Sequence, residues 1–226
     1  MNIFGFDYDG TIINIEPQKA KTFGELISHN WGVGKKEAAQ FWINGGGTSR
    51  RYKFDYFYKK RFNEKLSDKT YDEIESKYSK TLKQFFYPKV KLLSHALDIL
   101  RFVQSKFDFV FVSSGVPLEE IKYLVHLNGL SDYFDLVLGT SKKYPTKREH
   151  FKEILQAKKP DFWMFMGDSA EDMKLAKEYK AITIGLPTNE SEINLKNAGA
   201  DYVCSLKESK SVIKKLLTNY NSASEF

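Results

Sequence analysis

The chain carries the segment FGFDYDGT at residues 4–11, close to its start. Ile3, Phe4 and Phe6 predict a short buried strand, which ends in two carboxylates two residues apart. Side chains at positions i and i+2 of an extended segment point to the same face, roughly 6 to 7 Å apart. Asp7 and Asp9 therefore share a small volume, so one must be protonated or a cation must lie beside them. Oxygen ligands of this kind suit a small hard cation, and we expect Mg²⁺.

This segment resembles the first motif of the haloacid dehalogenase (HAD) superfamily of phosphotransferases, an apolar strand followed by DxDGT. The match continues through TIINIEP at residues 11–17, which resembles the DGTLxDSEP opening of members with a small helical cap. Asn14 and Ile15 depart from that pattern. The resemblance implies a Rossmann-like HAD core with an inserted cap, and it implies a Mg²⁺-dependent phosphatase that acts through an aspartyl-phosphate.

The rest of the chain divides into a helical part and an alternating part. Helical patterns run from Pro17 to the stop at Pro88. After Pro88, helical patterns alternate with short apolar runs, which predicts an α/β fold with a mainly parallel sheet flanked by helices. We predict an all-helical cap over residues 15–87 and a catalytic core over residues 1–14 and 88–226.

Composition sets limits on the class of protein. The chain has 226 residues, 42% of them hydrophobic and 15% aromatic, which is ample for a globular core. No apolar run approaches the roughly 20 residues needed to span a bilayer, and the N-terminus enters the first strand directly. The single cysteine, Cys204, agrees with a reducing compartment. We expect a cytoplasmic protein with no membrane partner, and the net charge of +6 suits an anionic substrate.

A second group of candidate residues follows the apolar run at residues 107–112. Ligands gather at the carboxyl ends of strands in such a sheet, and Ser113, Ser114 and Gly115 stand there. Their hydroxyls and free backbone N–H groups predict an anion site, although serine at this point also caps helices in ordinary turns. In the HAD superfamily a Ser or Thr directly follows this strand, so the resemblance gives Ser113 the phosphate-binding role.

A third group lies in GDSAED at residues 167–172, after the strand predicted at residues 162–166. It resembles the HAD motif GDxxxD, which implies that Asp168 is a direct metal ligand, with Asp7 and the backbone carbonyl of Asp9, and that Asp172 supports it. Asp172 has a second interpretation, because Ser169 and Asp172 are spaced as a capping box for the following helix. Both interpretations are compatible.

Two lysines are candidates for the cation that the superfamily uses beside its phosphate. Thr146 and Glu149 are spaced as a capping box, which places Lys147 in the first turn of a predicted helix. A positive charge there opposes the helix dipole and therefore suggests a function. Lys147 lies 21 residues before Asp168, whereas Lys143 lies 25 residues before it, in a degraded copy of the superfamily's KPxP loop. We favour Lys147 and keep Lys143 as the alternative.

The predicted cap contains a basic and aromatic run at residues 50–62, next to a glycine-rich turn at residues 44–49. Such a run suits single-stranded nucleic acid. Its aromatic residues recur at helical spacing, however, so a helix with a buried stripe and a solvated basic face is simpler, and we do not expect a nucleic-acid partner. Arg50, Arg51 and Lys53 remain candidates for holding the far end of a substrate. The four histidines receive no role.

Together these residues predict hydrolysis of a small phosphorylated metabolite, with Asp7 as nucleophile and Asp9 as general acid and base. A phosphohexomutase of the β-phosphoglucomutase type is the alternative, although Lys19 stands where such mutases carry a histidine. A non-catalytic phospho-acceptor or metabolite-binding module is the alternative from a different class. Turnover by the purified protein separates the two classes.

Overall fold

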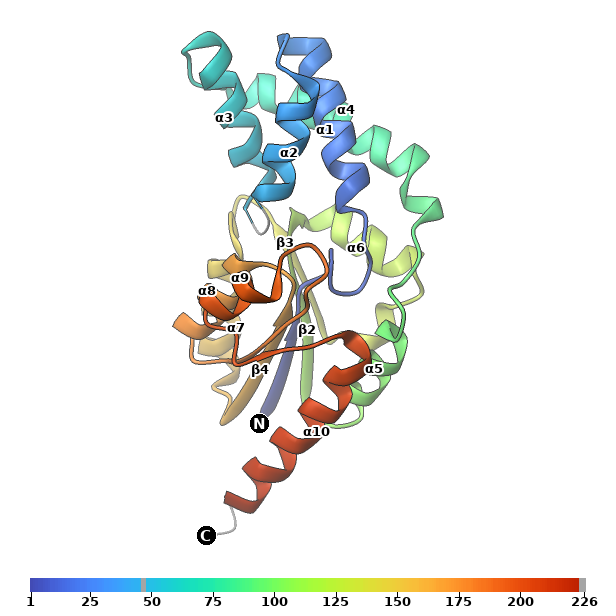
Figure 1. Ribbon diagram of the computed structural model, residues 1–226, viewed down its shortest axis with the longest axis vertical. Coiled ribbons are helices and arrows are strands. Elements are labelled where there is room, and N and C mark those ends of the chain that lie inside the picture. The colour runs from blue at the N-terminus through green and yellow to red at the C-terminus, as the bar shows by residue number, and fades with distance from the viewer. Residues whose placement is uncertain (46–47, 224–226) are drawn as a thin grey trace.

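The computed structural model describes residues 1–45 and 48–223, so residues 46 and 47 of the predicted glycine-rich turn lie outside the described part. Helices and strands alternate after the first four long helices (Figure 1). In chain order the elements are β1 (Asn2–Phe6), α1 (Glu16–Trp31), α2 (Lys35–Asn44), α3 (Arg50–Phe62), α4 (Asp68–Phe85), η1 (Tyr87–Lys89), α5 (Ala96–Gln104), β2 (Phe109–Pro117), α6 (Leu118–Leu127), η2 (Ser131–Tyr133), β3 (Leu136–Thr140), α7 (Lys147–Lys158), β4 (Phe162–Gly167), α8 (Ala170–Glu178), β5 (Ile182–Gly185), α9 (Glu192–Asn197), β6 (Tyr202–Val203) and α10 (Leu206–Ala223).

The described strands form one parallel sheet in the order β3-β2-β1-β4-β5-β6. β1 lies in the middle, where Phe6 is in register with Val112 of β2 and with Met166 of β4. Its residues are apolar on both faces because helices cover both sides of a parallel sheet. This arrangement confirms the predicted α/β fold with a mainly parallel sheet.

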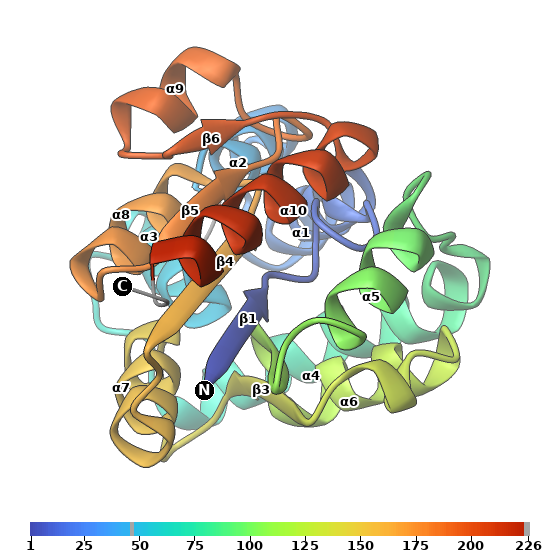
Figure 2. The same ribbon diagram turned by 90° about the horizontal axis from the view of Figure 1, so that it is seen from below.

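Two helical layers enclose the sheet, and Figure 2 shows them on opposite sides of the strands. Phe4 and Phe6 belong to the core shared with α5, α6 and α10, whereas Ile3 belongs to the core shared with α7 and α8. This alternation follows from the two-residue period of a strand. Gly5 points to the second face, where a Cβ atom would lie 2.4 Å from the Phe111 ring, so the rings of Phe111 and Phe165 fill its place.

We call α1–α4 the cap; it lies beyond the carboxyl ends of the strands (Figure 1). Its core is aromatic: the ring of Phe23 lies 5.0 Å from those of Trp42 and Phe54 and 5.9 Å from that of Phe57. α3 begins at Arg50 because the Ser49 hydroxyl accepts a hydrogen bond from the Tyr52 N–H. The helical cap is therefore present, and the exact division at residues 14/15 and 87/88 stays a prediction.

The main difference from the predicted elements is the length of β2. The apolar run predicts a strand that ends at Val112, but β2 continues through Ser113 and Ser114 to Pro117. The extension pairs with β3 after a register shift, with Pro117 opposite Thr140. Both serines therefore belong to an extended segment and point to opposite faces. Within residues 1–45 and 48–223, no helix is long and apolar enough to cross a membrane.

Candidate active site

Three buried aspartates meet at the carboxyl edge of the sheet. Asp7 directly follows β1, and its N–H donates to the Met166 carbonyl oxygen of β4 at 2.8 Å. This pairing brings Asp7 beside Asp168, which directly follows β4. Asp172 joins them from the first turn of α8, and ligand oxygens of the three carboxylates lie within 4.8 Å of one another. The candidate cation site is therefore formed by Asp7, Asp168 and Asp172, which lie far apart in the chain, and not by the side chains of Asp7 and Asp9.

Gly10 allows the chain to turn away from β1 directly above Asp168. Its φ of 82° lies in the left-handed region, which glycine adopts without strain. A Cβ atom at this position would lie 2.0 Å from Asp168 Oδ2 and 2.5 Å from Asn189 Nδ2. The glycine of the DxDG segment is thus needed both for the turn and for the close approach of the Asp168 carboxylate.

Lys147 contacts two of the three aspartates. Thr146 caps α7, and its side chain and that of Glu149 form the predicted capping box, so Lys147 is the first helical residue. Its Nζ lies 2.6 Å from Asp7 Oδ1 and 2.6 Å from Asp172 Oδ1. Lys143 is exposed instead and pairs with Glu153 at 3.2 Å. Of the two candidate lysines, the structure brings Lys147 to the aspartates.

The charges of this cluster are unusual because burial is nearly complete. Burial raises the pKa of Asp7 to about 7, against the lowering effect of Lys147, and Asp172 raises it further. Burial, Asp7 and Asp172 raise the pKa of Asp168 well above its ordinary value. Burial lowers the pKa of Lys147, but its two aspartate partners outweigh that effect, so its pKa is raised. One ammonium does not neutralise three carboxylates, and an all-oxygen donor set suits a hard divalent cation.

Asp172 contacts both Ser169 and Lys147. The Ser169 hydroxyl accepts a hydrogen bond from the Asp172 N–H at 3.1 Å and donates one to Asp172 Oδ2 at 2.8 Å. The other carboxylate oxygen accepts from Lys147. Ser169 therefore caps α8, and the Asp172 carboxylate joins this cap to the lysine beside Asp7, so only half of the predicted capping box is present.

Asp9 points away from the three aspartates and toward the cap. Its Oδ2 accepts a hydrogen bond from Nζ of Lys19, on α1, while its Oδ1 is buried without a hydrogen-bond partner in the described part of the chain. Burial raises the pKa of Asp9, with Lys19 opposing that effect. Glu16 lies 3.6 Å from the same ammonium. The Asp9 carboxylate thus lies apart from the cation cluster, although the sequence pattern places it in one small volume with the Asp7 carboxylate. A metal contact through the Asp9 backbone carbonyl stays a prediction.

The two serines of β2 have different surroundings. Ser114 lines the cavity between core and cap, whereas the Ser113 hydroxyl lies 2.8 Å from Nδ1 of His150. Nε2 of His150 lies 3.0 Å from the Gly139 carbonyl oxygen, so Nε2 carries the proton and Nδ1 accepts from Ser113. Burial lowers the pKa of His150 to about 4, so the ring is neutral at pH 7. The hydroxyl hydrogen of Ser113 is therefore directed at His150 and not into the cavity.

Cap and core are joined by an arginine that sequence patterns did not single out from its neighbours. Arg50 is buried and makes a bidentate ion pair with Glu120, the first-turn residue of α6, at 2.6 and 2.8 Å. It also lies 2.6 Å from Glu75 of α4. The sequence shows only that Arg50 is basic, because its partners lie 25 and 70 residues away.

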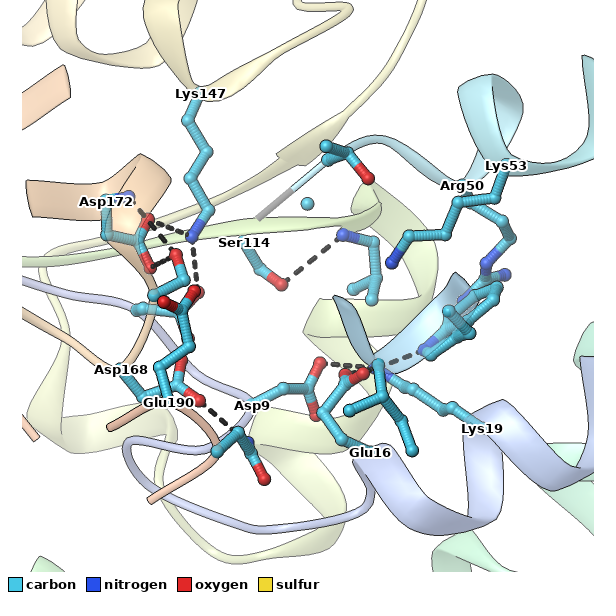
Figure 3. Close-up of a pocket in the computed structure, with 18 of the residues that line it drawn as sticks. Asp9, Glu16, Lys19, Arg50, Lys53, Ser114, Lys147, Asp168, Asp172 and Glu190 are labelled. Carbon is cyan, nitrogen blue, oxygen red and sulfur yellow. Dashed lines mark hydrogen bonds and ion pairs between the residues drawn. The ribbon is translucent and has the colours of Figure 1, made fainter. Parts of the chain in front are cut away.

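The aspartates, Lys147, Ser114 and Arg50 line one cavity of about 120 Å³ (Figure 3). Asp168, Asp172 and Lys147 lie on one side in this view, and the cap residues Lys19, Arg50 and Lys53 lie on the other. The cavity is lined by residues of both the cap and the core, so a molecule in it would touch both parts of the chain. The arrangement combines carboxylates for nucleophilic and acid–base chemistry with a candidate metal site.

A model of haloacid dehalogenase-like hydrolases matches residues 5–186, which is most of the chain. The chain belongs to the haloacid dehalogenase-like hydrolase family. This match confirms the resemblance seen in the DxDGT segment. Members of the HAD superfamily generally use a divalent metal, which agrees with the buried aspartate cluster.

Solved structures of HAD-like proteins share the fold. A predicted phosphatase from Clostridium acetobutylicum is 22% identical with a TM-score of 0.76, and the match covers 95% of this chain and 98% of that one. A haloacid dehalogenase-like hydrolase from Streptococcus pneumoniae is 19% identical with a TM-score of 0.73 over 93% and 97% of the two chains. A candidate β-phosphoglucomutase from Bacteroides vulgatus is 16% identical with a TM-score of 0.77 over 96% and 89%. No curated protein sequence matches the chain.

Proposed function

We propose that this HAD-family protein is a Mg²⁺-dependent phosphatase that hydrolyses a small phosphomonoester through an aspartyl-phosphate on Asp7. One observation carries the proposal. Asp7 is ion-paired with Lys147 and lies in a cavity that it shares with Asp9, two residues further on, and with Asp168. A nucleophilic carboxylate, a second carboxylate for proton transfer and a cation beside the phosphate are the groups that this reaction needs.

In the first half of the reaction, an Asp7 oxygen attacks phosphorus, and the bond from phosphorus to the leaving alcohol breaks. Lys147 favours the ionised form of Asp7, which the attack requires. Asp9 gives its proton to the departing alcohol oxygen. Burial raises the pKa of Asp9, which favours the protonated form that this step needs.

In the second half, the Asp9 carboxylate takes a proton from water, whose oxygen attacks phosphorus and releases phosphate and the Asp7 carboxylate. Lys147 and Ser114 supply N–H and O–H donors to the phosphoryl oxygens. Ser113 holds the adjacent backbone by its hydrogen bond to His150. We therefore assign the direct hydroxyl contact to Ser114 and a positioning role to Ser113.

The oxygen atoms around Asp7 suit Mg²⁺. Asp7, Asp168 and the Asp9 carbonyl would hold the ion, with Asp172 behind them, and these oxygens offer the hard donor set that it prefers. The bound ion would offset the negative charge on the transferring group.

Phosphate release tests the proposal. Wild type and Asp7→Asn are incubated with p-nitrophenyl phosphate and with a panel of sugar, nucleotide and small-acid phosphates, with Mg²⁺ or with EDTA. We expect metal-dependent release in wild type and a loss of roughly 10³-fold or more in Asp7→Asn. Release that persists in the folded Asp7→Asn variant would exclude Asp7 as the nucleophile.

A phosphohexomutase is the second candidate. The fold is shared with a candidate β-phosphoglucomutase, and the cavity is lined by both the cap and the core. Lys19 contacts Asp9 at the position where the mutases carry a histidine. Because a lysine holds its proton more tightly than a histidine, we rank phosphatase first. A coupled assay that detects sugar-phosphate isomerisation without phosphate release would reverse this order.

A further inference from the structure

Three cap cations line the cavity, and their ion pairs differ. Lys19 pairs with Asp9 and Glu16, and Arg50 pairs with Glu120 and Glu75. Lys53, one turn along α3 from Arg50, has no ion-pair or hydrogen-bond partner within the described residues, although only 4% of it is exposed. Its Nζ lies 4.1 Å from the centroid of the Trp42 ring. Of these three cap cations, Lys53 is therefore the one whose charge is free to pair with a ligand.

The position of Lys53 places this charge opposite the reacting groups. Figure 3 shows its side chain reaching into the cavity from the cap, across from Lys147 and Asp172 on the core side. A phosphate held at Lys147 would direct the remainder of its molecule toward Lys53. Trp42 is fixed beneath the ammonium because its Nε1–H donates to Glu16 Oε2 at 2.8 Å. A buried ammonium is costly unless an anion faces it, so an anionic ligand would be stabilised there.

We propose that Lys53, seated on Trp42, binds a compact anionic group on the leaving part of the substrate, so that the enzyme prefers phosphomonoesters of small acids over those of neutral alcohols. The anion is a carboxylate or a second phosphate, which a lysine binds by the same chemistry. The cavity of about 120 Å³ favours a compact molecule. This proposal rests on the phosphatase function and names its substrate class.

Arg50 and Arg51, the other two predicted cap cations, are weaker candidates for binding a substrate anion. Arg51 pairs with Asp55 at 3.0 Å and Asp68 at 2.9 Å and does not line the cavity. Arg50 lines it but is neutralised by two carboxylates. Of the three residues that the sequence left open, the geometry selects Lys53.

The test uses three substrates that differ only at the far end: 2-phosphoglycolate, 2-hydroxyethyl phosphate and ethylene glycol bisphosphate. We expect wild type to prefer one of the two anionic compounds over 2-hydroxyethyl phosphate by about tenfold or more in kcat/KM. The compound that is preferred shows whether Lys53 binds a carboxylate or a second phosphate. A wild type that does not discriminate, or that prefers the neutral compound, overturns the proposal without any variant.

Variants of Lys53 then test whether this residue causes the preference for anionic substrates. In Lys53→Met the preference falls to within about threefold of unity, whereas Lys53→Arg retains most of it. Lys59→Met, an exposed lysine on the same helix, serves as the matched control and keeps the wild-type ratio. A folded Lys53→Met variant that keeps the wild-type ratio also overturns the proposal.

A binding measurement separates failure of this proposal from failure of the phosphatase function. Asp7→Asn and Asp7→Asn/Lys53→Met are titrated calorimetrically with 2-phosphoglycolate, 2-hydroxyethyl phosphate and ethylene glycol bisphosphate. Tighter binding of an anionic compound that is lost with Lys53 supports the site even if no compound is hydrolysed. Equal binding by the two proteins overturns it.

Discussion

Nζ of Lys147 lies 2.6 Å from Oδ1 of Asp7, although 140 residues separate the two in the chain. The same ammonium holds Asp172 at 2.6 Å, so one cation stands between two buried carboxylates. Removing one member of such a group leaves uncompensated buried charge, which costs more than the ion pair itself contributes. Lys147 therefore has a structural role as well as its proposed role in binding phosphate.

Lys147→Met is expected to lower the free energy of unfolding by about 3 to 5 kcal/mol at pH 7 in EDTA. The loss should shrink as the pH falls. Asp7, whose pKa is already raised to about 7, then becomes protonated, and its repulsion with the buried Asp172 carboxylate disappears. Urea unfolding at pH 7 and pH 5 measures both effects. Lys143→Met is the matched control and should change stability by no more than about 0.5 kcal/mol, since Lys143 is an exposed lysine. Equal losses in the two variants would contradict the assignment.

We expect the aspartate cluster to make stability depend on Mg²⁺. At a concentration of 100 times its Kd, a bound ion stabilises the folded state by about 2.7 kcal/mol. For a chain of this length that raises Tm by roughly 5 to 10 °C. In Asp168→Asn the increase should disappear, while Tm in EDTA should not fall below that of wild type, because one of three mutually repelling carboxylates is gone. Thermal unfolding with and without Mg²⁺ measures this, and Asp132→Asn, at an exposed aspartate, should respond to Mg²⁺ as wild type does.

The neutral His150 makes stability depend on pH in a definite direction. The folded state holds the pKa at about 4 by burial, against an unfolded value near 6.5, so the unfolded chain binds the extra proton first as the pH falls. Stability from this residue is complete above about pH 6.5 and falls toward pH 4. We expect wild type to lose about 3 kcal/mol more than His150→Gln between pH 7 and pH 4. If the free energies of unfolding of the two proteins change with pH in parallel, the His150 ring has the same pKa in the folded and unfolded states, and this prediction is wrong.

The substrate preference assigned to Lys53 should also depend on pH. Burial lowers the pKa of Lys53 to about 8, with Lys19 and Arg50 acting in the same direction and Glu16 and Asp9 opposing them. As the pH rises through 8 the ammonium loses its charge, so the ratio of kcat/KM for 2-phosphoglycolate to that for 2-hydroxyethyl phosphate should fall toward unity by about pH 9. Lys53→Arg should hold its ratio over the same range, because a guanidinium stays charged. A ratio that is constant in wild type would argue against Lys53 as the anion-binding group.

Much of the site could be predicted because its residues follow strand ends. Asp7 and Asp168 directly follow apolar runs, and parallel strands bring their carboxyl ends to one edge whatever the chain distance between them. Lys147 could be favoured over Lys143 from its place in a capping box, which the structure contains. These inferences needed only local patterns and the general behaviour of parallel sheets.

Other parts depend on contacts that no local pattern reveals. The resemblance gives the phosphate contact to Ser113, but β2 continues to Pro117, and Ser114 is the serine that lines the cavity. The cap helix was predicted to have a solvated basic face, but Arg50 and Lys53 are buried in it. Arg50 finds its counter-charge in Glu120, on the core, and that contact separates it from Lys53. No role could be predicted for His150, because it contacts Ser113 of β2 and Gly139 of β3 only once α7 packs against the sheet.

The central position of β1 also affects how the chain can fold during synthesis. β1 is translated before β4, which begins at Phe162, although the two strands pair in the folded protein. At roughly 5 to 20 residues per second, about 8 to 30 s separate the synthesis of the two strands. For this time the nascent chain carries an apolar strand with an unpaired edge, while the helices at residues 16–85 can already form locally. Asp7 is thus translated well before Lys147 and Asp168, the residues that lie beside it once the sheet is complete.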